Sequence, residues 1–179
     1  MLQENQIASK ENVALFHAAQ TGNVEECESL LRKGAKPNFF FRPDDQKNSL
    51  HVAAEHGYTD VCKTLIRGGA EVNSIASADQ STALTLAAHN DDPTLIRLLL
   101  DHGANINHGN MDSSITLCCL LNTANSYGNT ALHEACRIGN NATTHCLLQS
   151  GADINAVNHK GSSPLHTFCY GDQDNQKGK

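Results

Sequence analysis

Residues 130–139 read TALHEACRIG, and the core of this pattern recurs along the chain. Each full copy has a leucine followed, three and four residues later, by two small residues; the copies occupy residues 14–22, 49–57, 83–91 and 131–139, and a fifth begins as SPLH at 163–166. The leucines are Leu15, Leu50, Leu84, Leu132 and Leu165, so the steps between them are 35, 34, 48 and 33 residues. A period of this kind indicates tandem structural units, here with one longer connection.

Further markers keep the same phase in all four full units. A leucine-rich pair lies 11 and 12 residues after the second small residue, and then come a Gly-Ala dipeptide and an asparagine. The pairs are residues 30–31, 65–66, 99–100 and 147–148, the dipeptides are 34–35, 69–70, 103–104 and 151–152, and the asparagines are Asn38, Asn73, Asn107 and Asn155. The leucine pair predicts the buried face of a second helix, and the glycine predicts a helix end with positive φ.

One such unit cannot bury its own apolar face. The small pairs allow neighbouring helices to approach closely, and stacked units supply each other's interior. Because the chain has no Trp, five Phe and 39% hydrophobic residues, the core must consist mainly of Leu, Ala, Val, Ile and Cys. The pattern therefore predicts an all-α solenoid.

The repeated segments resemble the ankyrin repeat family. The family's signature is matched by residues 163–166 (SPLH), 130–133 (TALH) and 151–155 (GADIN), and the resemblance covers roughly residues 12–170. It implies stacked helix-turn-helix units joined by β-hairpin-like finger loops. The expected divisions are a cap at 1–11, repeats at 12–46, 47–80 and 81–107, an insertion and finger at 108–127, a fourth repeat at 128–160, a partial fifth at 161–171, and a polar tail at 172–179.

The third connection carries the insertion. Asn107 and Leu132 are 25 residues apart, against 10 between Asn155 and Leu165, so about 15 residues are extra. The run ITLCCLL at 115–121 is apolar enough that we expect it to pack on the array, as a short helix or a degenerate first helix. The alternative is an excursion that binds a partner. The partial fifth repeat is either a natural cap or a break within a longer array.

The composition excludes several classes of protein. Thirteen Lys and Arg against 19 Asp and Glu give a formal charge of −6, the opposite of the basic surplus typical of nucleic-acid binders. No apolar run approaches the roughly 18 residues of a membrane helix, and residues 1–6 (MLQENQ) lack the features of a secretory signal. The seven cysteines are scattered without a Cys-x-x-Cys motif, which predicts reduced thiols in the cytoplasm or nucleus. We also expect a monomer.

The sequence carries no catalytic or metal-binding signature. Phosphate-loop, dinucleotide-binding and nucleophile-elbow motifs are all absent from it. His51, His133 and His166 occupy the family's histidine position, where the ring resembles a strut that binds the finger backbone. We therefore predict no enzyme activity, no cofactor and no metal.

The resemblance implies a protein partner, bound through the concave face and the finger loops. The predicted partner-binding residues are Phe39, Phe40, Phe41, Arg42, Glu55, His56, Asp79, Gln80, His89, Asn90, Tyr127, Asn129, Arg137, Ile138, His159 and Lys160. For the three phenylalanines, one alternative is an exposed anchor beside the arginine, and the other is packing beneath the finger. For the whole chain, the alternative is an ankyrin segment serving a larger enzyme, channel or ubiquitin-ligase adaptor.

Overall fold

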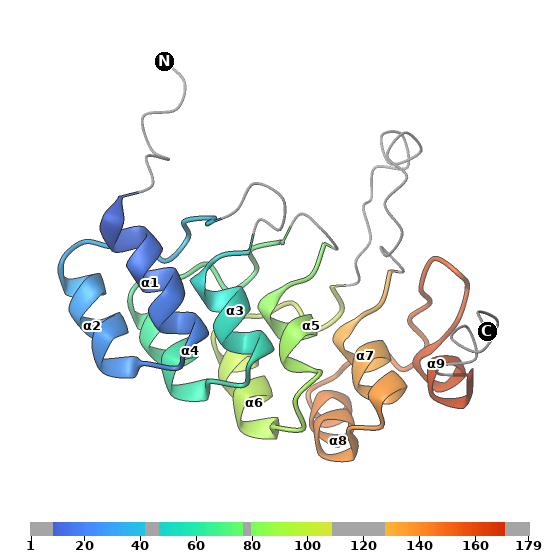
Figure 1. The fold of residues 1–179 in the computed structure, drawn as a ribbon. Coiled ribbons are helices and arrows are strands. Elements are labelled where there is room, and N and C mark those ends of the chain that lie inside the picture. The colour runs from blue at the N-terminus through green and yellow to red at the C-terminus, as the bar shows by residue number, and fades with distance from the viewer. Residues whose placement is uncertain (1–8, 42–46, 77–79, 109–127, 171–179) are drawn as a thin grey trace, which may run out of the picture.

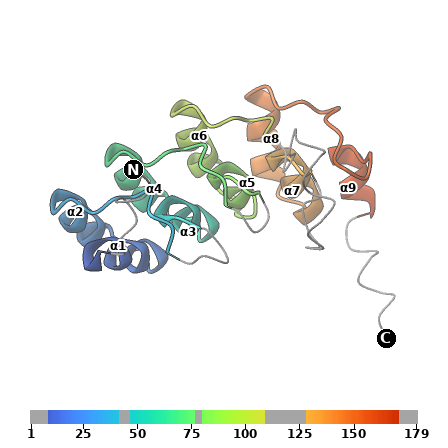
Figure 2. The ribbon, with the colours of Figure 1, turned by 90° about the horizontal axis from the view of Figure 1, so that it is seen from above.

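The computed structural model describes residues 9–41, 47–76, 80–108 and 128–170, and the regular structure in these residues is helical. The helices are α1 (Lys10–Gln20), α2 (Val24–Arg32), α3 (Ser49–Glu55), α4 (Thr59–Arg67), α5 (Ala83–Ala87), α6 (Pro93–Asp101), α7 (Ala131–Ile138), α8 (Asn141–Gln149) and α9 (Pro164–Tyr170). The odd-numbered first helices stand side by side in one row and the even-numbered second helices in another (Figures 1 and 2). The expected all-α solenoid of stacked helix pairs is confirmed.

Local chemistry begins the first helices where the repeat pattern places them. Thr130 accepts a hydrogen bond from the backbone N–H of His133, whose ring Nδ1 in turn accepts from the backbone N–H of Thr130. The same reciprocal box joins Asn48 to His51 at the start of α3. These bonds satisfy N–H groups that a helix end leaves without intrahelical partners.

The repeated apolar positions form one continuous core. The anchor leucines of the four full units are at most 2% exposed, and at most 3% of each alanine of the small pairs is accessible. Leu65, Leu99 and Leu147 from the second helices close the core from the other row. The glycines after the second helices, Gly34, Gly69, Gly103 and Gly151, have φ between 84° and 91°, as their sequence position predicted.

Asparagines of the predicted finger position tie each unit to the next. The side chain of Asn73 donates to the carbonyl of Gly103 at 2.9 Å and accepts from the backbone N–H of Asn105 at 2.8 Å. Asn38 makes the equivalent pair of bonds to Gly69 and Glu71. These bonds span neighbouring units, so they fix the register of the stack.

Several predicted segments lie outside the described residues. They are most of the cap (residues 1–8), the finger tips 42–46 and 77–79, the insertion from residue 109 to 127 with its apolar run at 115–121, the last residue of the partial fifth repeat (171), and the tail at 172–179. Residues 10 and 11 of the predicted cap belong to α1. In the part of the chain that is described, no helix is both long and apolar enough to cross a membrane.

Candidate binding surface

The first helices display a variable row of side chains directly after their small pairs. In unit 2 the two positions are Glu55 and His56, in unit 3 His89 and Asn90, and in unit 4 Arg137 and Ile138. We call these six residues the first-helix face. His56, His89, Arg137 and Ile138 are exposed, whereas Glu55 and Asn90 are half-buried.

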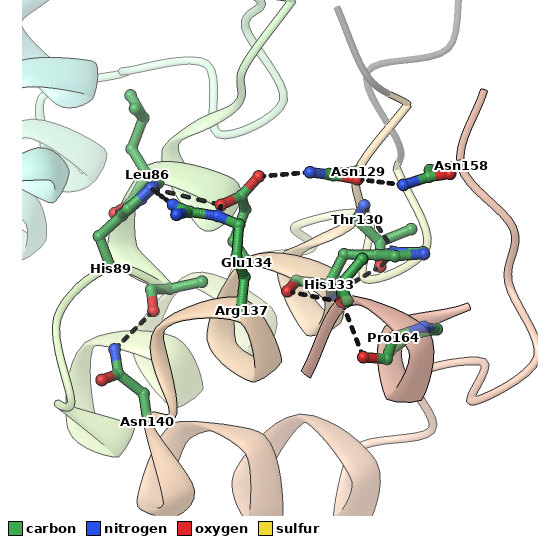
Figure 3. A network of polar contacts seen from close by, with 12 residues as sticks. Leu86, His89, Asn129, Thr130, His133, Glu134, Arg137, Asn140, Asn158 and Pro164 are labelled. Atoms are coloured by element: carbon green, nitrogen blue, oxygen red, sulfur yellow. Dashed lines mark hydrogen bonds and ion pairs between the residues drawn. The ribbon is translucent and has the colours of Figure 1, made fainter. Parts of the chain in front are cut away.

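A carboxylate organises this face where units 3 and 4 meet (Figure 3). Glu134 Oε2 accepts a hydrogen bond from Arg137 Nε at 2.9 Å and lies 3.5 Å from Nε2 of His89, which follows α5. Its other oxygen accepts from Asn129 Nδ2 at 2.8 Å. Because only 13% of the Glu134 side chain is exposed, both oxygens need these partners.

The same network continues into the finger of unit 4. Asn158 Nδ2 donates to Asn129 Oδ1 at 2.9 Å, and Asn158 Oδ1 accepts from the backbone N–H groups of Lys160 and Ser162. Both asparagines are buried. The positions of Arg137 and His89 are therefore coupled to the finger through amide side chains (Figure 3).

Glu134 was not predicted from the sequence, and Asn158, which precedes the predicted contact residues His159 and Lys160, was not predicted to lie in a buried network. Glu134 lies three residues before Arg137, a spacing at which opposite charges meet on a helix, so that signal was present. Asn158 has no such signal, because its partner Asn129 comes from a different finger. Asn129 itself was predicted as a contact residue, and the structure shows its side chain engaged inside the network.

In unit 2, the face is held by a second ion pair and by a ring stack. Lys47 Nζ lies 2.9 Å from both carboxylate oxygens of Glu55. His56 Nδ1 lies 2.8 Å from the carbonyl of Val52, and its ring stacks on Tyr58 with centroids 5.7 Å apart. The exposed imidazole is thereby held in a defined orientation.

Asn90 is occupied between units. Its amide donates to the carbonyls of Ala54 and Glu55, at the C-terminal end of α3. Asn140 does the same for the carbonyl of Ala88 at the end of α5. These bonds satisfy terminal carbonyls that helices leave open, so Asn90 serves the stack whether or not it also meets a partner.

The three phenylalanines of the first finger are half-buried. The Phe41 ring stacks on Phe16 with centroids 4.8 Å apart and meets the edge of His17 at 5.1 Å. Phe16 occupies the position that carries histidine in units 2 and 4. Packing of Phe41 therefore connects the finger to α1, while partner contact by Phe39 and Phe40 stays a prediction.

The remaining predicted residues lie on other fingers. Gln80 is half-buried with φ of 59°, a left-handed conformation, and His159 and Lys160 are exposed on the finger of unit 4. The ring of His159 lies so close to Gly128 that a Cβ there would be 2.9 Å from it. Arg42, Asp79 and Tyr127 lie outside the described residues.

The chemistry of the described residues is that of a packed scaffold. Burial raises the pKa of Cys27 to about 11 and that of Cys62 to about 12, so both thiols are protonated at neutral pH and are poor nucleophiles. Among the described residues, no cluster of three or more His, Cys, Asp or Glu side chains has the arrangement of a metal site.

The chain is similar to proteins with repeated helical units. The family model described as "Ankyrin repeats (3 copies)" matches residues 2–76 and 69–158. A "Transient receptor potential cation channel subfamily A member 1 homolog" of Caenorhabditis elegans is 33% identical, over 51% of this chain and 9% of the channel. A "Putative ankyrin repeat protein FPV031" of Fowlpox virus (strain NVSL) is 38% identical, over 49% of this chain and 22% of the viral protein. The chain therefore spans less than a quarter of either relative. Because the family model covers most of its length, the chain belongs to the ankyrin repeat family.

Proposed function

We propose that this chain is a protein-interaction module without catalytic activity, which binds a partner protein through the first-helix face and the fingers. The observation that carries the proposal is the contrast between frame and surface. Anchor leucines, small pairs and finger asparagines repeat from unit to unit, while the residue directly after the small pair changes from Glu55 to His89 to Arg137. A rigid frame with a varied surface suits recognition, because little conformational freedom remains to be lost on binding.

The size and charge of the array are consistent with this role. A standard protein interface needs about 800 Å² per partner, which an array of four full units accommodates. The formal charge of −6 favours encounter with basic partners. The five cysteines in the described residues are free thiols, which supports a reducing intracellular compartment. We take the free chain to be a monomer.

Affinity capture with paired baits tests the proposal. The full chain, its Arg137→Ala/Ile138→Ser variant and its Lys63→Ala/Arg67→Ala variant are compared by quantitative mass spectrometry. Lys63 and Arg67 are exposed on α4 in the second row, so they form a matched control. A partner retained by the control and lost by the α7 variant supports the proposal, provided circular dichroism shows equal folding. Equal capture by all three baits would refute the assignment of the face.

A second candidate role is that of a scaffold segment within a larger protein. The similarity to the channel homologue, of which the matched region is only 9%, favours it. Immunoblotting of the native polypeptide with an antibody against the described repeats discriminates between the two. A band near the 19.2 kDa of this chain supports the stand-alone module, and a much larger band supports the segment.

A further inference from the structure

At the junction of units 3 and 4, the carboxylate of Glu134 has a single oxygen left for two basic side chains. Its Oε1 accepts from Asn129 Nδ2 at 2.8 Å, and Asn129 Oδ1 accepts from Asn158 at 2.9 Å. Because both asparagines are buried, this chain of bonds holds the carboxylate in one orientation. Oε2 alone therefore meets Arg137 Nε, at 2.9 Å, and His89 Nε2, at 3.5 Å (Figure 3).

The backbone determines which ring nitrogen of His89 carries the hydrogen in the neutral form. Nδ1 lies 3.2 Å from the carbonyl oxygen of Leu86, and a carbonyl oxygen can only accept a hydrogen bond. Nδ1 is therefore the donor, and Nε2 presents a lone pair. Nη2 of Arg137 lies 3.5 Å from Nε2, so the neutral ring is an acceptor for the guanidinium.

Protonation of His89 reverses this relation. Nε2 then carries a hydrogen, so it no longer accepts from Arg137 and instead directs a donor at Glu134 Oε2. That oxygen now has two donors to satisfy, and the two cationic groups repel each other across 3.5 Å. An imidazole is the side chain that gains its proton near neutral pH. A moderate fall in pH therefore weakens the bonds that hold Arg137 against the array.

The other titratable side chains on the elements packed against α5 are not bonded to the His89 ring. α3, α6 and α7 pack against α5. These side chains are His51, Glu55 and His56 on or directly after α3, Asp91, Asp92, Arg97 and Asp101 on or directly before α6, and His133 and Cys136 on α7. In the part of the chain that is described, the bonds of the ring are those to Leu86, Glu134 and Arg137. Its response to protons is therefore shared with Glu134 and Arg137.

Charge and exposure at this junction indicate which chemical group it binds. Glu134, Arg137 and His89 together carry no net charge when His89 is neutral, and one positive charge when it is protonated. The Arg137 side chain is 37% exposed, and its terminal amino groups form a fork that matches a carboxylate. Ile138 beside it is 41% exposed and offers an apolar contact. The junction thus suits an acidic residue that has an apolar neighbour.

We propose that protonation of His89 releases Arg137 to bind an aspartate or glutamate carboxylate of the partner protein, so that binding strengthens as the pH falls. The inference rests on the proposed function, because it gives the chemistry of the partner at the same face. The charge of −6 on the whole chain acts on the approach of a partner. The junction acts at contact distance, where it selects an acidic residue within that partner.

The free chain tests the first step without any partner. In isotope-labelled protein, NMR follows the Nε–H signal of Arg137 and the ring signals of His89 from about pH 8 to about pH 5, with circular dichroism to verify folding. We expect the Arg137 signal to shift, and its exchange with water to accelerate, as the His89 ring gains its proton. His89→Gln should abolish this response. His102→Gln should preserve it, because His102 is exposed after α6 and has a similar Nδ1 contact, 2.8 Å from the carbonyl of Leu98.

Two short peptides test the second step. Acetyl-Leu-Glu-amide supplies a carboxylate for Arg137 and an apolar side chain for Ile138, whereas acetyl-Leu-Gln-amide lacks the charge. Each is titrated into the full chain at both ends of the pH range, over which the glutamate stays mostly ionised, and the same NMR signals report binding. Acid should tighten binding of the glutamate peptide by roughly 1.5- to 5-fold, the effect of one exposed ion pair. It should leave the glutamine peptide unchanged, and His89→Gln should remove the effect.

Several results would overturn the inference. One is an Arg137 signal that does not respond when His89 is protonated, or that responds equally in His89→Gln. Others are no binding of the glutamate peptide, an equal effect of acid on both peptides, or an effect that persists in His89→Gln. These results would leave the proposed function intact, because capture through Arg137 and Ile138 at neutral pH needs no proton on His89. Capture that does not depend on Arg137 and Ile138 would instead refute the proposed face, whatever the NMR response of the free chain.

Discussion

Replacing Glu134 by alanine measures how much the buried polar network contributes to the junction of units 3 and 4. The substitution removes the acceptor of Asn129 Nδ2, which is 2.8 Å from the carboxylate. Asn129 is buried, and a buried donor left without a partner costs about 1–3 kcal/mol. Arg137 loses its ion pair too, but its side chain is more than a third exposed, so water replaces much of that interaction.

Two companion variants separate the hydrogen bond from the charge. Glu134→Gln keeps an oxygen that can accept from Asn129, so we expect a loss of at most about 1 kcal/mol, the range of a partly exposed ion pair. Arg137→Ala removes the ion pair and leaves the Asn129 bond, so its loss should fall in the same range. The predicted order of destabilisation is therefore Glu134→Ala first, with the other two variants well below it.

Urea unfolding followed by circular dichroism gives the three free energies of unfolding. Because units of a repeat array can unfold separately, hydrogen exchange of α5 and α7 should accompany it and show where protection is lost. Equal losses for Glu134→Ala and Glu134→Gln would refute the reasoning, since the charge would then matter and the Asn129 bond would not. An Arg137→Ala loss as large as that of Glu134→Ala would lead to the same conclusion.

Four further outcomes follow from the structure. Burial lowers the pKa of His133 from 6.5, so the unfolded chain binds a proton more readily than the folded chain does. The free energy of unfolding should therefore stay constant above pH 6.5 and fall as the pH drops below it. In the His133→Asn variant, the midpoint of urea unfolding should depend less on pH. Phe41→Ser should lower the free energy of unfolding by about 1–2 kcal/mol, measured by urea titration, because the stack on α1 is lost. Deleting residues 110–123 should leave a folded array by circular dichroism, since the repeat pattern resumes at residue 130; an insoluble product would place the insertion in the core. In peptide mapping after iodoacetamide treatment near neutral pH, Cys27 and Cys62 should stay unmodified until urea unfolds the protein, and rapid native labelling would contradict their burial.

The repeating frame was predictable because its interactions lie within one unit or between equivalent positions. Leu132 on α7 and Leu147 on α8, for example, stand at a spacing that every unit repeats and are both buried, and Gly151 after α8 has a positive φ. Asn73 bonds the next unit's loop because each unit is a copy of the last. Sequence spacing alone reveals such contacts, because the repeat period determines the positions of both residues in each contact.

The candidate surface was less predictable because its contacts join positions that do not repeat. Glu134 has no carboxylate counterpart in units 1 to 3, and its partner Asn129 comes from the finger preceding α7. Exposure was also invisible in the pattern: Leu165 satisfies the repeat as well as Leu132 does, yet their surroundings differ. A pattern specifies which residue can be buried, and the neighbours present decide whether it is.

The residue after each anchor leucine varies together with the finger that follows it. His51 and His133 accept a backbone N–H at Nδ1, so their Nε2–H groups donate to the finger carbonyls of Ser74 and Ser162. Unit 1 has Phe16 at this position, and the contact from its finger is the stacked ring of Phe41 in place of a backbone carbonyl.

Unit 3 has Thr85 at this position, and the bonds of its short side chain to the described residues lie within its own turn: the hydroxyl donates to the carbonyl of Thr82 and accepts from the N–H of Thr82. This is also the unit followed by the 25-residue connection from Asn107 to Leu132. A histidine at this position needs a finger carbonyl within hydrogen-bond distance of its Nε2–H, and this limits the length of the finger. A threonine that bonds within its own turn does not limit the length of the finger. The first helix of unit 3 thus lacks the side chain that would penalise a longer finger, which is a physical reason why the insertion stands after this unit and not after its neighbours.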